Sequence, residues 1–269
     1  MMFLNHAGLR YSPDLTGEGT RHVDCLTKGE LGARITYVDS KNRGTPMIRL
    51  KKSEALQREI RQDDPVDLAI PTADLVHEAM RTGKIDDATG FMEYGMTENR
   101  VMHDSLILRV SDVLAYLARF GEDEVEKFQR REYYELAKNY LPRTVDELLQ
   151  IFTEYQRGHF SNTTVVDEPD RYVVRHDPCG SGGRLIRTRE VATTQKAYPW
   201  SWGKSGVPYY CIHCCLAWEI IPIELRGYHL RVNLIPEKPE DACVHLLYKS
   251  PELIPEEYFT RIGKTKTIK

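Results

Sequence analysis

The sequence lacks any long apolar run, any strong excess of charge and any tract of low complexity. No stretch of the 269 residues approaches the roughly 18 consecutive apolar side chains of a membrane-spanning helix. The 37 basic and 40 acidic side chains leave a net charge of −3, which is unlike the basic footprint of a nucleic-acid-binding protein. We therefore expect a protein that binds neither membranes nor nucleic acid.

The first residues also lack the pattern of a signal peptide. Met1 to His6 contain no basic segment followed by an apolar run. We therefore expect a cytoplasmic protein whose cysteines stay reduced. In such a protein, clustered cysteines indicate metal binding or catalysis more often than disulfides.

Hydrophobic periodicity divides the chain into three parts. Residues 1–45 contain many turn formers and no clear periodicity, so we expect an irregular N-terminal arm. Residues 46–160 follow the helical period, whereas residues 161–269 alternate with the period of strands. We expect an α+β fold with an N-terminal helical region packed on a C-terminal antiparallel sheet, the two forming one compact unit.

Within the helical region, the clearest pattern runs from Arg100 to Phe120. A wide apolar stripe there predicts a buried helix that ends at Gly121. Thr144 opens a capping-box pattern for a further helix that ends at Gly158. The stripe comprises Leu106, Val110, Val113 and Leu117, widened by Ile107 and Leu114.

The C-terminal region reads as strand, strand, helix, strand, strand. A cysteine-bearing helix is predicted between the two strand pairs, with Pro222 bending or interrupting it. A short last helix should dock on the sheet. The expected strands are 171–177, 183–188, 228–235 and 242–248, and the expected helices are 211–226 and 255–262.

Five of the six cysteines lie from residue 179 onward, and they define the candidate site. Cys211 and Cys214 form a Cys-x-x-Cys step, which lets two sulfurs bind one ion from a single turn. Cys179 lies in a Pro-Cys-Gly turn, and Cys243 lies on a later strand that also carries His245. We expect Cys179, Cys211, Cys214 and Cys243 to bind a metal, with His176 as another candidate ligand.

The mixture of cysteine and histidine favours zinc over iron or an iron–sulfur cluster, because no dense run of cysteines is present. The simpler interpretation is a small buried hydrophobe, and it suits Cys25 and Cys215 best. A third interpretation is thiol chemistry without metal, with Cys211 activated at a helix N-terminus. The glycine-rich run from Gly180 to Arg184 fits a plain hairpin turn better than an anion cradle.

Several residues are candidates for moving protons. His103 and Asp104 lie in the apolar helix, where buried polar groups need partners. The simpler interpretation is a histidine bonded to a helix neighbour, and the alternative is that both residues face the cysteine site. His176, Asp177 and His213 are further acid–base candidates because they lie beside the cysteines in the sequence.

The layout of residues 90–250, with Cys211, Cys214 and Cys243, resembles the 4-vinyl reductase domain and the 2-aminothiazoline-4-carboxylate hydrolase-like proteins. Those families also have helices followed by strand, strand, cysteine-bearing helix, strand, strand. The resemblance implies a small-ligand pocket that can hold zinc, and a homodimer. The loop from Asp177 to Gly183 and the N-terminal arm lie outside the shared pattern.

Together these features favour a metal-dependent hydrolase or lyase that acts on a small cyclic or aromatic compound. Four aromatic residues just before the Cys-x-x-Cys step either form the wall of a pocket for a flat ligand or pack in the core. They are Trp200, Trp202, Tyr209 and Tyr210. The alternative is a non-enzymatic small-ligand or metal sensor with a structural zinc site. No effector module is recognisable in the sequence, which favours the enzyme.

Overall fold

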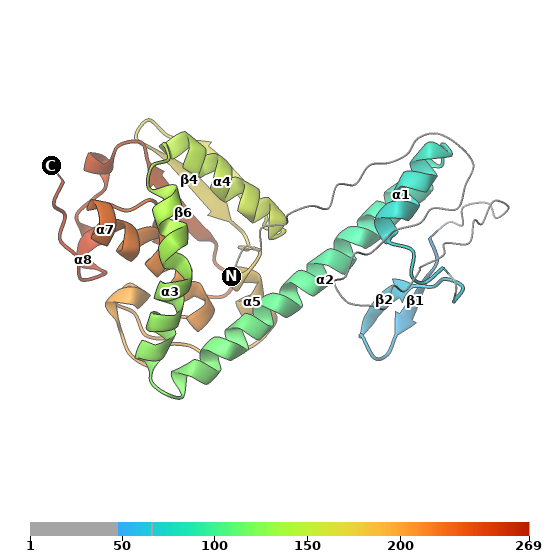
Figure 1. Cartoon of the computed structure of the whole chain (residues 1–269), viewed down its shortest axis with the longest axis horizontal. Helices are drawn as coiled ribbons and strands as arrows, with labels where there is room; N and C mark the ends of the chain where they lie inside the picture. The colour runs from blue at the N-terminus through green and yellow to red at the C-terminus, as the bar shows by residue number, and fades with distance from the viewer. Residues whose placement is uncertain (1–47, 66, 269) are drawn as a thin grey trace, which may run out of the picture. The chain divides into compact units, whose positions relative to one another are not determined.

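The computed structural model describes residues 48–65 and 67–268, so the expected N-terminal arm and Cys25 lie outside the described residues. Contacts divide the chain into two compact units, Met1–Met96 and Thr97–Lys269. The division falls within the long helix α2 (Ile85–Ala118), which Figure 1 shows. Within the described residues, no helix combines the length and the apolar character that crossing a membrane requires.

The first unit contains a β-hairpin followed by helices. Strands β1 (Leu50–Ser53) and β2 (Arg58–Arg61) pair antiparallel, so the prediction of helix from about residue 50 was wrong. Gln57 in the turn has a φ of 51°, the left-handed conformation that a tight hairpin turn needs. Helix α1 (Thr72–Arg81) and the start of α2 bury a small core around Ala79, Ala88 and Phe91.

The second unit is the α+β fold expected from the sequence, with helices first and a four-stranded antiparallel sheet after them. The strand order is β3-β4-β6-β5, and helix α4 contacts β3 and β6. The α-helices are α3 (Glu122–Tyr140), α4 (Val145–Gly158), α5 (Gly182–Thr188), α6 (Ile212–Cys215), α7 (Ile221–Arg226) and α8 (Glu257–Thr260), and the strands are β3 (Thr163–Asp167), β4 (Arg171–His176), β5 (Val232–Leu234) and β6 (Cys243–Tyr248).

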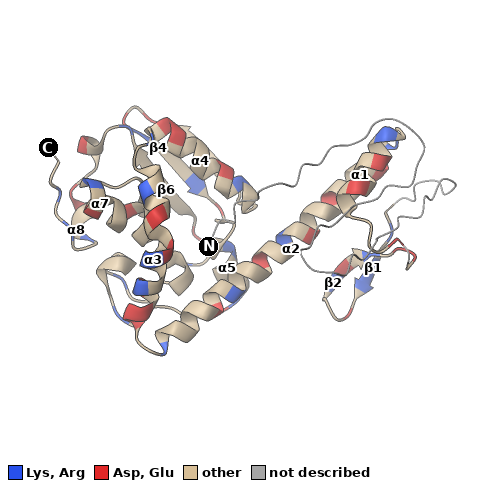
Figure 2. Cartoon of the chain, in the orientation of Figure 1, with Lys and Arg blue, Asp and Glu red and all other residues tan. Residues whose placement is uncertain are grey.

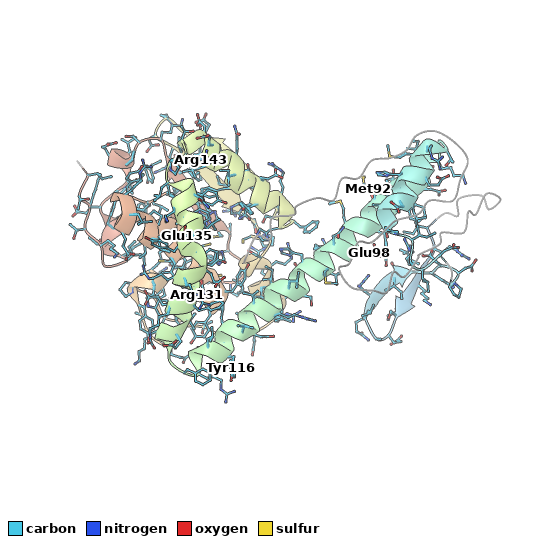
Figure 3. The ribbon with its side chains drawn as sticks, in the orientation of Figure 1. Met92, Glu98, Tyr116, Arg131, Glu135 and Arg143 are labelled. Atoms are coloured by element: carbon cyan, nitrogen blue, oxygen red, sulfur yellow. The ribbon has the colours of Figure 1, made fainter. Side chains whose placement is uncertain are left out.

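Capping explains where the helices of this unit begin. Gly121 has a φ of 129° and separates α2 from α3, as its position in the sequence predicted. The predicted capping box at Thr144 is confirmed, because its hydroxyl accepts from the Glu147 amide while the Glu147 carboxylate accepts from the Thr144 amide. Charges of both signs are interspersed along the outer sides of the helices, for example Arg131 and Glu135 on α3 (Figures 2 and 3).

The prediction that the whole stripe of α2 is buried was wrong in part. Ile107 and Leu114 are buried in the core of the second unit, but Leu106, Val110 and Val113 are each about half exposed, at 50%, 45% and 51%. Only one side of α2 contacts the core. The buried face of the helix is therefore narrower than the apolar stripe in the sequence suggested.

The strand predicted over residues 183–188 was also wrong. These residues form helix α5, in which Leu185 is buried and the Thr188 hydroxyl bonds back to the carbonyl of Arg184. The place beside β4 is taken by β3, an edge strand whose Val165 and Val166 are exposed. The strand predicted over 228–235 is shortened to β5.

The helical run from residue 209 to residue 226 lies in the middle of the second unit. It begins with the 3-10 turn η2 (Tyr209–Cys211), passes through α6, and changes to a π-helical turn, η3 (Leu216–Ile220), before α7. Pro222 follows the π turn, which agrees with the predicted interruption. Two further 3-10 turns are η1 (Pro199–Ser201) and η4 (Pro251–Leu253).

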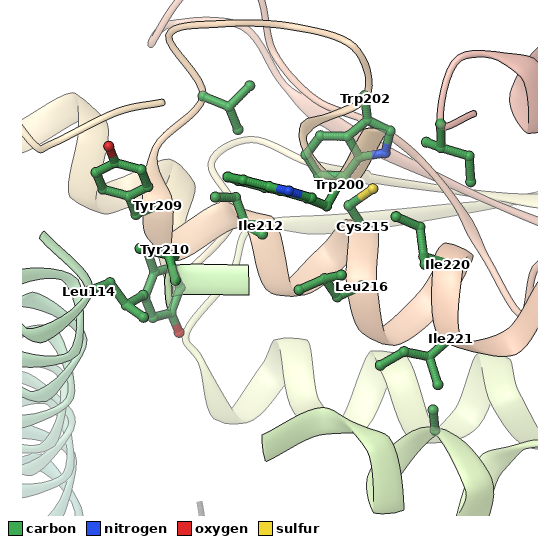
Figure 4. Close-up of a cluster of buried hydrophobic side chains, with 14 of the residues drawn as sticks. Leu114, Trp200, Trp202, Tyr209, Tyr210, Ile212, Cys215, Leu216, Ile220 and Ile221 are labelled. Atoms are coloured by element: carbon green, nitrogen blue, oxygen red, sulfur yellow. The ribbon is translucent and has the colours of Figure 1, made fainter. Parts of the chain in front are cut away.

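The main core packs around this helical run (Figure 4). Cys215 is fully buried there beside Leu216, which agrees with its interpretation as a small hydrophobe. The four aromatic residues before the Cys-x-x-Cys step are buried in the same core, so the structure favours packing over a ligand wall for them. Helix α8 docks beside the sheet through Phe259, as expected for the last helix.

Candidate functional site

The turn that carries Cys179 follows directly from strand β4. The Cys179 carbonyl accepts a hydrogen bond of 2.8 Å from the amide of Arg184 in α5. The Gly180 amide donates to the Ser161 hydroxyl at 2.6 Å. A Cβ at Gly180 would lie only 1.9 Å from the carbonyl oxygen of His159. The glycine is therefore required for close packing on the end of α4, and this packing fixes the position of the Cys179 turn.

The same turn packs against the cysteine-bearing helix. A Cβ at Gly182 would lie 2.6 Å from the sulfur of Cys211, so the start of α5 and the end of η2 are in direct contact. The buried side chain of Gln129 in α3 donates to the Tyr209 carbonyl at 2.7 Å and holds η2 in place. Cys179 and Cys211 are therefore brought together although thirty-one residues separate them in the sequence.

Strand pairing places Cys243 at the same end of the sheet. Cys243 pairs with His176 across β4 and β6, and His176 also pairs with Thr163 across β3. A chain of polar contacts follows, from the Thr163 hydroxyl to His176 Nδ1 at 2.9 Å and from His176 Nε2 to His245 Nδ1 at 3.1 Å. The His245 Nε2 atom then lies 3.3 Å from the Cys243 sulfur.

Cys214 contacts a buried arginine and a histidine. Arg231 Nη2 donates to the Cys214 sulfur at 3.4 Å, and its Nε donates to Asn233 at 2.7 Å. The Nδ1 of His213 is 2.6 Å from the Tyr210 carbonyl, which can only accept, so the His213 Nε2 is the acceptor atom. The Cys214 thiol lies 3.5 Å from this Nε2 and donates to it.

Burial keeps several free side chains of this cluster neutral, because it raises the pKa of Cys211 and Cys214 and disfavours their charged forms. Burial, and then the nearby Cys179, Cys214 and Cys211 thiols, raise the pKa of Cys243 well above its usual value. Burial lowers the pKa of His176 to about 3 and that of His213 to about 4. Arg231 is therefore a buried cation beside neutral thiols and imidazoles.

The expectation that a helix N-terminus lowers the pKa of Cys211 was wrong. Burial raises the pKa of this thiol well above its usual value, and the neighbouring Cys214 and Cys179 thiols add to the effect. The helix that follows, α6, has only four residues, so its dipole is small compared with the cost of burying a thiolate. As a free group, Cys211 is a thiol rather than an activated nucleophile.

Accessibility separates the cluster from the core. Cys179, Cys211, Cys214 and Cys243 are free and only half-buried, whereas Cys215 is fully buried. Each of the four cysteine residues therefore keeps part of its surface exposed, although burial of the sulfur raises the pKa of Cys211, Cys214 and Cys243. Two surface hollows of about 330 and 420 Å³ lie elsewhere in the second unit, and none of the four cysteines lines them.

The donor types of the cluster suit zinc, since thiolates and neutral imidazoles are its usual ligands. The described residues contain no group of three or more His, Cys, Asp or Glu side chains placed to hold an ion. Zinc therefore stays an expectation that rests on the types of donor.

Comparisons with protein-family models, curated proteins and solved structures found no match. The resemblance to the 4-vinyl reductase domain and its relatives consequently stays an expectation. The site must be interpreted from its own residues.

His103 and Asp104 reach the Cys179 turn through an arginine. The Asp104 carboxylate accepts from Arg184 Nε at 2.9 Å and from Arg184 Nη2 at 2.7 Å, and Arg184 lies in the helix that follows the turn. His103 Nδ1 lies 2.9 Å from Asp104, and its Nε2 lies 2.6 Å from His159 Nδ1. The pair thus has polar partners, but it touches none of the four cysteines through a described hydrogen bond.

Asp177 has a different environment from the other acid–base candidates. Hydrogen bonds from Arg187 at 2.7 Å and from Arg175 at 3.1 Å lower the pKa of its carboxyl. The Arg187 side chain also binds the carbonyls of Pro239 and Glu240. Asp177 is therefore an ionised group that joins the Cys179 turn to the loop before β6.

Sequence reasoning missed Arg231, Asn233 and His159 as parts of this region. Arg231 was expected to be an ordinary residue of the predicted strand over 228–235, and nothing in that alternation distinguishes a buried arginine from an exposed one. His159 lies at the end of α4, and only the fold brings it to His103. The interleaving of Cys243 with His245 was visible in the sequence, but their contact with His176 depended on strand register.

Proposed function

We propose that this chain is a metal-dependent enzyme, a hydrolase or lyase acting on a small molecule, with its metal–thiolate centre at Cys179, Cys211, Cys214 and Cys243. The observation that carries the proposal is the convergence of four partly accessible thiols from a turn, a helix start and a strand around one buried arginine. A buried cation needs negative charge nearby, and metal-bound thiolates supply it. We propose the cytoplasm as the location, where free thiols persist.

Cys179, Cys211 and Cys214 would hold the metal with one position left open, and the bound metal would supply a Lewis acid for a substrate oxygen or for water. The residues of the chain supply the proton acceptors. Because burial lowers their pKa values, His176 and His213 are neutral imidazoles near neutral pH. We propose a small cyclic or aromatic compound as substrate, as the sequence suggested.

The metal content of the purified protein tests the proposal. We expect stoichiometric metal in the wild type and none in a Cys211→Ser/Cys214→Ser double variant. Cys215→Ser is the matched control, because Cys215 adjoins Cys214 but is buried in the core. Full metal retention in the double variant would contradict the proposed site.

The second candidate is a non-enzymatic sensor with a structural centre. It is favoured by one observation, that the two hollows described above lie away from the cysteines. Chelation followed by circular dichroism separates the two functions. A structural centre contributes directly to folding, so its removal should unfold the second unit. We expect the helices and sheet to survive, because most of the main core is built of side chains other than Cys211 and Cys214, which pack against it.

A further inference from the structure

The part of helix α2 that belongs to the second unit exposes several large apolar side chains. Met102 is 63% exposed, Tyr116 is 56% exposed and Phe120 is 66% exposed. Leu106 and Val113, each about half exposed, lie between them in the sequence. Single exposed apolar side chains are normal on a protein surface, but a contiguous exposed patch marks an interaction site.

The spacing of these side chains is that of a coiled-coil seam. Successive positions are four, three, four, three and four residues apart, and such steps return to the same side of an α-helix. We call this set of six exposed residues the α2 seam. It comprises Met102, Leu106, Arg109, Val113, Tyr116 and Phe120.

A second interface accounts for the width of the apolar stripe on α2. Ile107 and Leu114 are buried in the core of their own unit. Leu106 and Val113 belong to the same stripe but stay about half exposed after the chain has folded. Their side of the helix is therefore left for contact with another molecule.

Arg109 is the charged member of the α2 seam, and it sets the direction of pairing. A polar residue at one seam position specifies the register and orientation of a coiled coil. Asp112 adjoins Val113 at the edge of the seam, and its side chain is exposed. In a parallel pair of α2 helices, Arg109 would face Arg109 of the other copy. In an antiparallel pair with the seams aligned, Arg109 faces Val113 and lies next to Asp112 of the other copy.

We propose that the α2 seam binds the α2 seam of a second copy of this chain, in an antiparallel homodimer. Met102 then lies opposite Phe120 of the second copy, and Leu106 lies opposite Tyr116. Two-fold symmetry makes every such contact twice, as is usual in homodimers.

The second copy is the occupant because the seam is complementary to itself. Its spacings read the same from either end, so the apolar positions meet in an antiparallel pair. The same alignment brings Arg109 of each copy beside Asp112 of the other, and opposite charges arranged in this way fix the register of an interface. The inference is independent of the metal centre, whose residues lie outside the seam.

The mass of the full chain in solution tests the proposal. In sedimentation over a concentration series, we expect a species of twice the 31.1 kDa of the chain, which dissociates on dilution. Leu106→Glu places a charge in the interface and should raise the Kd of the dimer about 30-fold or more. Leu253→Glu is the matched control, because Leu253 is 48% exposed in η4, outside the seam, and this variant should dimerise like the wild type.

Exchange of the two charges tests the antiparallel register. Arg109→Asp and Asp112→Arg each bring like charges together, so each should raise the Kd about tenfold or more. The double variant Arg109→Asp/Asp112→Arg restores opposite charges across the interface and should dimerise like the wild type. A double variant as weak as the single ones would overturn the register. Circular dichroism checks that every variant is folded.

Two results would overturn the dimer. One is a wild-type chain that stays monomeric throughout the series, and a loss of stability in the Leu106→Glu monomer would then show that the chain itself covers the seam. The other is a dimer that Leu106→Glu leaves intact, because such a dimer forms through another surface.

Discussion

The Nη2 atom of Arg231 lies 3.4 Å from the sulfur of Cys214, inside a unit where Arg231 is only 3% exposed. In the metal-free protein the buried guanidinium contacts a neutral thiol and two aromatic faces, and the charge of Glu219 compensates it only in part, so its burial is costly. Beside a metal-bound thiolate the same guanidinium is a counterion. The contact therefore has opposite energetic consequences in the metal-free and metal-loaded protein.

Replacement of Arg231 by methionine should separate these two effects. We expect Arg231→Met to weaken metal binding about 10–100-fold, the range found when groups that support metal ligands are removed. The metal-free variant should be at least as stable as the metal-free wild type, because the cost of burying the guanidinium has been removed. Competition with a chelator and urea unfolding measure the two quantities.

Arg175→Met provides the control for this prediction, since the Arg175 side chain on β4 is 55% exposed. Its metal affinity should equal that of the wild type. Equal affinity in Arg231→Met and wild type would show that the arginine does not compensate charge at the centre.

Gly182→Ala should disturb the site by a purely steric route. The added methyl would overlap the Cys211 sulfur, and overpacking of this kind costs about 1–3 kcal/mol. We expect a loss of bound metal with the overall secondary structure retained. Metal analysis and circular dichroism on the same sample test this expectation.

The matched control is Gly158→Ala, because nothing lies within 4 Å of a Cβ at that position. It should keep its metal and change the free energy of unfolding by about 0.5–1 kcal/mol at most. If both glycine variants bind metal equally well, close packing at Gly182 is unimportant for the site.

His229 should make the protein less stable as the pH falls. Burial, followed by the charge of Arg261, lowers its pKa to about 3, and neither ring nitrogen makes a hydrogen bond within the described residues. Glu219 lies 3.5 Å away, but its carboxylate accepts from Arg261 and Trp202. The unfolded chain binds a proton near pH 6.5 and the folded chain does not, so protonation favours unfolding between these two pKa values.

We therefore expect His229→Leu to reduce this pH dependence. Between pH 7.5 and 5.5 the wild type should lose about 1.4 kcal/mol more stability than the variant, the contribution of one histidine with an unfolded pKa near 6.5. Urea unfolding at both pH values gives the difference. Parallel losses in the two proteins would indicate that His229 is protonated in the folded state.

The Asp104–Arg184 ion pair should stabilise the fold at neutral pH and lose this contribution in acid. Burial alone raises the pKa of Asp104, but hydrogen bonds from Arg184 and His103 outweigh this effect and lower the pKa below its usual 3.8. The contribution is present above the unfolded pKa and is lost as the pH falls through the folded value. Because the Asp104 side chain is 40% exposed, its contribution should be at most about 1 kcal/mol.

Asp104→Asn should accordingly lower the stability at pH 7 and have a smaller effect at pH 2.5. Asp170→Asn serves as the control, since the Asp170 side chain has a similar exposure of 43% and its arginine contact is longer, at 4.0 Å. Thermal unfolding at the two pH values measures both. An equal loss of stability in Asp104→Asn at pH 7 and at pH 2.5 would point to lost packing rather than lost charge.

The fold could be predicted from the sequence where local signals agreed with packing. The capping box at Thr144, the Gly121 boundary and the alternation of β4 and β6 were each visible in a short window. Strand β3 was missed because it is an edge strand whose Val165 and Val166 are exposed, so it carries no clean inside–outside alternation. Residues 183–188 have an alternation of apolar and polar side chains that is compatible with a strand, but they form a helix. The strand period and the helix period cannot be distinguished over six residues.

The candidate site was partly predictable for the same reason. Residue type and spacing identified the cysteines as candidate ligands. The pairing of β4 with β6 then places Cys243 opposite His176. The role of Arg231 was not predictable, because burial of an arginine depends on tertiary packing. The contact of His103 with His159 could not be predicted either, since fifty-five residues lie between them in the sequence.

The π-helical turn over Leu216–Ile220 interrupts the helical run that begins with Cys211 and Cys214 and ends with α7. A π turn accommodates one residue more than an α-helical turn, so the residues before and after it keep nearly the angular positions of a continuous α-helix. Deleting one residue within Leu216–Ile220 should therefore leave the orientation of Cys214 relative to α7 nearly unchanged. The same deletion in a regular α-helix would rotate the residues beyond it by about 100°.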